Sequence, residues 1–180
     1  NKWKKLVSDY FQEVKAAGER VVYTDICGRC NALSLGADVN YNFALQPAGY
    51  YFMRSRHAIE VTGNIMHPVE FYRFVKQIED AGHTLSFATF DPIVGLESHA
   101  PRHTDALHRD IVYAHFAKCL ARLLRVMRPG GLIYLECPFQ LMNVVDWFNK
   151  KSVEEYASSL WLKAFCVRHK CTVKIERSIS

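Results

Sequence analysis

Short runs of β-branched and aliphatic residues alternate along this chain with longer amphipathic segments, and this alternation limits the folds open to it. The runs that predict buried strands are residues 20–27, 57–62, 84–90, 132–137 and 171–177. The segments with helical spacing are residues 3–17, 68–81, 110–127 and 152–169. Strands that alternate with helices predict right-handed crossovers, and therefore an α/β domain with a mainly parallel sheet and helices on both faces.

Within the helical segments, apolar residues recur every three or four positions, which indicates one buried face. In residues 68–81, the side expected to be buried carries Val69, Tyr72, Val75 and Ile78. Residues 38–53 are rich in aromatic side chains without a clear period, so we assign them no secondary structure. We expect a loop at 93–109 and a turn at 128–131.

The bulk composition is that of one domain with a sizeable core. A chain of 180 residues that is 49% hydrophobic suits one domain rather than two. No apolar run approaches the roughly 18 residues of a membrane span, so we expect no membrane contact. The net charge of +5 permits an anionic partner such as RNA without requiring one.

The six cysteines are scattered through the chain, and no signal-peptide core follows the N-terminus. This cysteine usage favours an intracellular, reducing compartment. Because the chain begins at Asn1 and not at Met, we expect a fragment of a longer chain or a processed form.

Acidic, amide and turn-forming residues follow the expected strands directly. The segments concerned are 25–30, 63–64, 91–92 and 136–137. In a doubly wound parallel sheet, ligands bind beyond the carboxyl ends of the strands. We therefore expect these segments, with Asp25 and Asp91 among their residues, to meet at one edge of the sheet.

Two motifs narrow the choice further. The first, V-Y-T-D-I-C-G-R-C at 22–30, is a hydrophobic strand that ends in an acid and a tight turn. Backbone amides of such a turn approach a ligand closely, and Asp25 can bind an ammonium or a hydroxyl group. The second motif, R-P-G-G-L-I-Y-L at 128–135, follows a long helix. Either motif alone also fits an ordinary turn. A helix followed by Pro-Gly-Gly and then by an aliphatic strand is a more specific pattern than the turn by itself.

The order of these motifs resembles that of the class I, S-adenosylmethionine-dependent methyltransferases. The resemblance implies one Rossmann-like domain over residues 1–180, with S-adenosyl-L-methionine as the cofactor. The family's first motif, acid-x-Gly-x-Gly-x-Gly, holds the methionine end of the cofactor, and Cys27, Arg29 and Asn31 stand at its glycine positions. Gly63-Asn64-Ile65 is similar to the family's G-D-I segment, whose acid contacts the adenine. The cofactor-binding residues implied are Asp25, Cys27, Gly28, Asn64 and Asp91.

Over most of its length the chain resembles the FtsJ-like ribose 2′-O-methyltransferases. That family has a Lys-Leu pair in a helix before the first strand, where this chain has Lys5-Leu6, and an Asp after the fourth strand, where it has Asp91. Glu136 stands where the family has a Lys in the strand after Pro-Gly-Gly, and Glu176 lies near the position of the family's final Glu. The resemblance therefore implies Lys5, Asp91 and Glu136 as the catalytic positions.

In that family, a Lys-Asp-Lys-Glu arrangement lowers the pKa of one Lys so that it deprotonates a ribose 2′-hydroxyl. Glu136 cannot replace that Lys as an amine base. Two hypotheses follow. The first is S-adenosylmethionine-dependent methyl transfer to RNA, with a ribose 2′-hydroxyl as the expected acceptor. The second is a catalytically inactive relative that serves as a structural or RNA-contacting subunit of a larger assembly.

The cysteines allow two other interpretations. Cys27-Gly28-Arg29-Cys30, after a strand and before a helix, has the thioredoxin-like placement of a redox dithiol. Cys27 and Cys30 with Cys166, His169 or Cys171 would also supply zinc ligands, although their spacing is loose. The leading interpretation keeps Cys27 and Cys30 as reduced thiols and assigns no metal.

Overall fold

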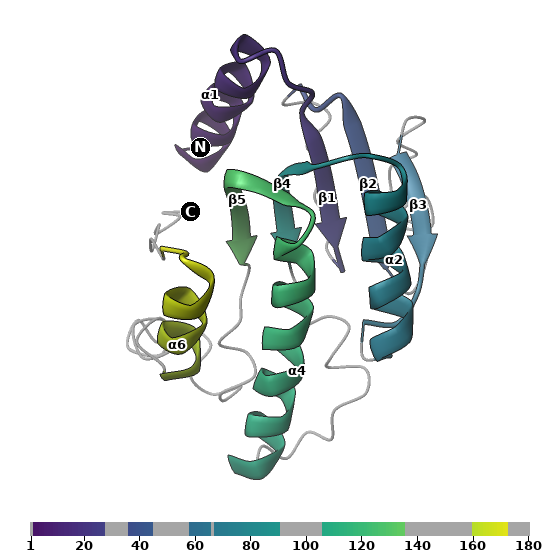
Figure 1. Ribbon diagram of the computed structural model, residues 1–180, viewed down its shortest axis with the longest axis vertical. Helices are drawn as coiled ribbons and strands as arrows, with labels where there is room; N and C mark the ends of the chain where they lie inside the picture. The colour runs from purple at the N-terminus through teal and green to yellow at the C-terminus, as the bar shows by residue number, and fades with distance from the viewer. Residues whose placement is uncertain are drawn as a thin grey trace.

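The chain forms a five-stranded sheet in which every neighbouring pair of strands is parallel (Figure 1). The computed structural model describes residues 2–27, 36–44, 58–65, 67–90, 106–135 and 160–172. The strands are β1 (Val22–Ile26), β2 (Val39–Ala44), β3 (Ala58–Thr62), β4 (Leu85–Phe90) and β5 (Met127–Leu135). The helices are α1 (Lys2–Ala16), α2 (Pro68–Asp80), α4 (Ala106–Leu124) and α6 (Leu160–His169). None of the described helices is long and apolar enough to cross a membrane.

The strand order is β3-β2-β1-β4-β5, which is the order of a doubly wound, Rossmann-like domain. Helices α2 and α4 pack side by side on one face of the sheet, as Figure 1 shows. Helix α1 covers the other face, where Val7, Phe11 and Val14 form a cluster with Tyr23 of β1 and Phe87 of β4. The predicted α/β fold with a parallel sheet is therefore confirmed.

The core on the α2 and α4 face is largely aromatic. Phe43 of β2 lies between Phe71 and Phe74 of α2, with ring centroids 5.5 and 4.9 Å apart. Tyr41 contacts Phe74 edge to face at 6.3 Å, and Phe71 contacts Phe90 of β4 at 6.4 Å. These rings join β2, α2 and β4 into one packed layer, in which offset and edge-to-face geometries are favoured.

The buried stripe of α2 differs from the one expected. It consists of Phe71, Phe74, Val75 and Ile78. Val69 and Tyr72 are 44% and 43% exposed, so our assignment of them to the buried side was wrong. The aromatic residues decide the rotation of the helix, because two phenylalanines bury more apolar surface than one valine and one tyrosine.

Four predicted strands are found at their expected places, and four segments differ from expectation. β2 lies within residues 38–53, to which we had assigned no structure, and α4 begins at Ala106, inside the expected loop. The expected turn at 128–131 is instead a bulge within β5. There β4 advances from Leu85 to Phe87 while β5 advances from Met127 to Leu132. Of the expected last strand, residues 171 and 172 are not strand, and 173–177 lie outside the described residues.

Gly63 follows β3 at a point where the chain passes against the core. A Cβ atom at this position would lie 2.7 and 2.9 Å from two carbons of the Phe43 ring. We therefore expect Gly63→Ala to lower the free energy of unfolding by about 1–3 kcal/mol, measured by urea denaturation.

The matched test places the same change in a Phe43→Leu background, where the smaller side chain makes room. Gly63→Ala should then cost clearly less than it does opposite phenylalanine. An equal cost in both backgrounds would show that the ring is not what requires glycine.

Candidate functional site

The topological switch point of the sheet lies between β1 and β4, where the strand order reverses. At the carboxyl ends of these strands, Asp25 is paired in register with Thr89. Open α/β sheets bind ligands in the crevice beyond this point, because connections leave the two strands in opposite directions. Asp25 is only 4% exposed, although it is a carboxylic acid. A buried acid at this position is unusual and marks the candidate site.

A chain of hydrogen bonds holds the Asp25 carboxylate. Thr89 Oγ1 donates to Asp25 Oδ1 at 2.6 Å, and the Tyr23 hydroxyl lies 2.6 Å from Thr89 Oγ1. A threonine hydroxyl has one hydrogen, which Thr89 gives to Asp25, so the Tyr23 hydroxyl is the donor in the second bond. Both bonds are buried, where an acid without donors would be strongly disfavoured.

The polar residues form a row that crosses all five strands. In register across the sheet, the row reads Glu60, Asn42, Asp25, Thr89 and Tyr134. It lies on the same face as Tyr23, since residues two apart in a strand point to the same side. Within the described structure, the fully buried carboxamide of Asn40 and the Oδ1 atom of Asn42 have no hydrogen-bond partner. This row, together with Asn40 on the same face of β2, has the hydrogen-bonding groups that a polar ligand needs.

Cys27 turns the chain immediately after β1. Its φ angle is 61°, in the left-handed region that glycine adopts readily and other residues seldom do. Its main-chain N–H donates to the Phe43 carbonyl at 2.8 Å, which fixes the turn against β2. Cys27 is a thiol, half-buried against the core. The backbone therefore makes a glycine-type turn at the position where the resemblance led us to expect glycine.

The loop that presents Asn64 is fixed from both sides. Glu70 Oε2 accepts a 2.6 Å hydrogen bond from the Asn64 main-chain N–H, and the Asn64 carbonyl accepts one from the His67 N–H. His115 Nε2 of α4 lies 2.7 Å from the Ile65 carbonyl oxygen and therefore donates to it. The loop after β3 is thus held in place at the same edge as the end of β1.

The structure describes some of the predicted site residues and not others. Asp25, Cys27 and Asn64 lie at or just beyond the carboxyl ends of β1 and β3. Lys5 is exposed in the first turns of α1. Gly28, Asp91, Glu136 and Glu176 lie outside the described residues, so their roles stay predictions.

The described residues bear on the zinc alternative in part, and the redox alternative depends on Cys30, which they do not include. Burial raises the pKa of the Cys166 and Cys171 thiols, which favours the protonated form over a thiolate. No group of three His, Cys, Asp or Glu among the described residues, Cys166, His169 and Cys171 included, could hold a metal ion. Cys30 lies outside the described residues, and the doubly wound strand order gives no support to a thioredoxin-like fold.

No protein-family model matches the chain, and no curated protein matches it. Among solved structures it is similar to WbdD, known from a 2.2 Å crystal structure, with a TM-score of 0.45 and 17% sequence identity. The match covers 78% of this chain and 31% of WbdD, so the chain spans about a third of that protein's length. The strand order, and not this likeness, establishes the Rossmann-like fold.

The hydroxyl of Thr89 is the group whose removal should disturb the site most. Thr89→Val keeps the shape but removes the donor to Asp25, so we expect the free energy of unfolding to fall by about 2–3 kcal/mol. Thr89→Ser keeps the hydroxyl and should cost about 1 kcal/mol, for one lost methyl group. Equal losses for the two variants, measured by urea denaturation, would show that the hydrogen bond to Asp25 contributes nothing.

Because Cys27 has a left-handed backbone conformation, we expect glycine at this position to destabilise the protein less than valine does. Cys27→Gly should stay within about 1 kcal/mol of wild type, because relief of strain offsets the added freedom of the unfolded chain. Cys27→Val should cost about 2 kcal/mol, because a β-branched side chain is strongly disfavoured at this φ angle. Thermal unfolding of the two variants measures the difference, and a valine variant as stable as the glycine variant would contradict the assigned backbone.

Proposed function

We propose that the protein is an S-adenosylmethionine-dependent methyltransferase that acts on RNA, with a ribose 2′-hydroxyl as the acceptor. The observation that carries the proposal is the buried Asp25 at the switch point, followed by the glycine-type turn at Cys27. In the class I methyltransferases that the sequence resembles, an acid and a turn at this place hold the methionine end of the cofactor. The Rossmann-like strand order agrees with a ligand at this edge.

The described residues fit such a cofactor. A carboxylate in a poorly hydrated position binds an ammonium or a hydroxyl group more strongly than one in water. At the end of β3, the carboxamide of Asn64 offers both a donor and an acceptor to an adenine edge. Glu70 and His115 hold the backbone around Asn64, so little ordering would be needed when a ligand binds.

S-adenosyl-L-methionine would supply an electrophilic methyl group, and the chain must then supply a base for the acceptor hydroxyl. The resemblance assigns this task to Lys5, Asp91 and Glu136. A carboxylate beside a lysine stabilises the protonated lysine and opposes its use as a base. On this argument Glu136 is the residue that limits catalysis. The net charge of +5 suits an RNA substrate, whose phosphates attract basic proteins.

The first test is calorimetric titration with S-adenosyl-L-methionine. Wild type should bind, and Asp25→Asn, which keeps the shape but removes the charge, should bind at least tenfold more weakly. Circular dichroism and the unfolding midpoint of Asp25→Asn control for misfolding. A wild-type protein that binds no cofactor would contradict the proposal and favour the inactive, structural relative.

The second test is methyl transfer to RNA by variants at the catalytic positions. Glu136→Lys should increase transfer, because it restores the family's amine at that position, and Asp91→Ala should abolish it. The inactive relative predicts no transfer by wild type, none gained with Glu136→Lys, and an Asp91→Ala variant that folds normally. Incorporation of a labelled methyl group into RNA measures all three.

A further inference from the structure

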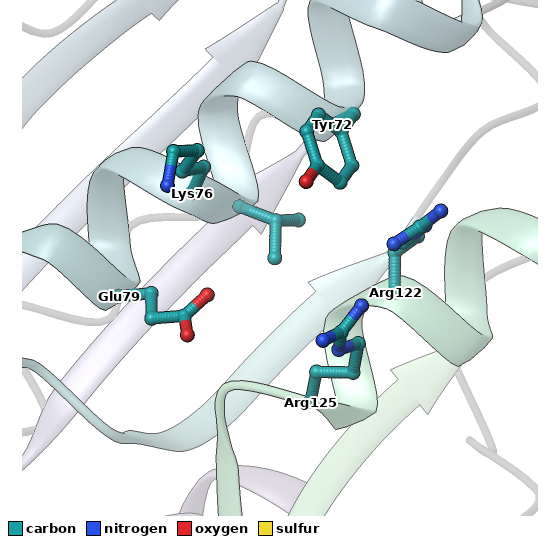
Figure 2. A pocket seen from close by; sticks show the side chains of 6 residues that line it. Tyr72, Lys76, Glu79, Arg122 and Arg125 are labelled. Carbon is teal, nitrogen blue, oxygen red and sulfur yellow. The ribbon is translucent and has the colours of Figure 1, made fainter.

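Helices α2 and α4 leave a shallow hollow between their outer sides. It is lined by Tyr72, Val75, Lys76 and Glu79 of α2, by Arg122 in the last turn of α4 and by Arg125, which directly follows that helix. Figure 2 shows Arg122 and Arg125 on one side of the hollow, across from the α2 side chains. Guanidinium groups pair with phosphates through two parallel hydrogen bonds, and aromatic side chains beside them stack with bases in proteins that bind single-stranded nucleic acid.

In the described structure, no carboxylate neutralises the charge of the two arginines. The guanidinium carbon of Arg122 lies 4.6 Å from the centre of the Tyr72 ring, a cation–π contact that orders the side chain. In the described part of the chain, neither Arg122 nor Arg125 forms an ion pair with a carboxylate, whereas Lys76 pairs with Asp80 at 3.6 Å. Glu79 is the acid that lines the hollow.

The α4 and α6 side of the hollow is basic. The stretch from Ala114 to Arg125, at the end of α4 and just after it, carries Lys118, Arg122 and Arg125 and no acid. Helix α6, which packs against α4, carries Lys163 and Arg168 and no acid. These helices lie on the face of the sheet that α2 also covers, as Figure 1 shows. Helix α2, on the other side of the hollow, carries Glu70, Glu79 and Asp80 beside Arg73 and Lys76, so the excess of positive charge that would attract a phosphate lies on the α4 and α6 side.

The hollow is separate from the candidate site. Arg125 stands two residues before Met127, where β5 begins, and Glu79 lies at the end of α2, before β4 begins at Leu85. The hollow is therefore near the amino ends of the strands, whereas Asp25 and Asn64 lie at the carboxyl ends. A single RNA molecule is long enough to reach from the amino ends of the β-strands to their carboxyl ends.

We infer that this hollow binds phosphate groups of a single-stranded RNA, with Arg122 and Arg125 as the main contacts. The proposal rests on the RNA partner of the proposed function but not on its cofactor. RNA suits the hollow better than an acidic polypeptide, because the exposed Tyr72 ring and the neighbouring Val69 offer flat and apolar surface to a base. The role of the surface is to dock the RNA away from the point of reaction.

The test is binding of a fluorescent oligouridylate, without cofactor, followed by anisotropy over a range of salt concentrations. Arg122→Ala/Arg125→Ala should weaken binding about tenfold and reduce the dependence of log K on log salt by about 1 to 2. Arg122→Lys keeps the charge but loses the flat guanidinium, so it should fall between wild type and the double variant.

Arg20→Ala/Arg73→Ala is the matched control, because it removes the same charge from exposed positions that do not line the hollow. An equal loss in the control, or no loss in the double variant, would overturn the assigned surface. A parallel titration with an acidic peptide would overturn RNA as the partner if the double variant lost peptide binding alone. Wild type that binds no RNA would refute the RNA partner, whereas wild type that binds RNA but no S-adenosyl-L-methionine would refute only the methyltransferase proposal.

Discussion

A carboxylate that is buried in the middle of a sheet must receive hydrogen bonds, and this requirement ties β1 to β4. Asp25 receives its bond from Thr89, and Thr89 in turn receives one from Tyr23, so the pairing of the two strands also completes the polar network. The pairing sets the switch point of the doubly wound sheet. Fold and candidate site therefore depend on the same contact, because a shift in strand register would separate the buried acid from the threonine that donates to it.

The sequence was informative where one physical rule dominates. Continuous apolar runs predicted β1 and β4 because strands buried on both faces need them. β2 was missed because asparagine is disfavoured in strands, although Val39, Tyr41 and Phe43 alternate with Asn40 and Asn42 at a period of two. The stripe of α2 was assigned wrongly because several rotations of that helix bury apolar residues. Only packing against Phe43 selects Phe71 and Phe74.

Some residues of the candidate site could also be predicted from the sequence, and others could not. Asp25, Cys27 and Asn64 could be proposed from local motifs, because they follow strands that the sequence already indicated. Thr89, Glu70 and His115 could not, because their roles depend on partners brought together by the fold. Thr89 meets Asp25 across 64 residues of chain, and His115 meets Ile65 across 50. At Cys27 the backbone has the positive φ angle that is typical of glycine, although the residue is a cysteine.

The central claim is that a ligand binds at the carboxyl ends of β1 and β3. The most direct measurement is the mapping of amide chemical-shift changes when S-adenosyl-L-methionine is titrated into isotope-labelled protein. We expect saturable changes at Asp25, Cys27 and Asn64, with little change at Arg122 and Arg125 near the opposite edge. Saturable chemical-shift changes confined to residues near the amino ends of the strands, or no changes anywhere in the protein, would contradict the assignment of this site.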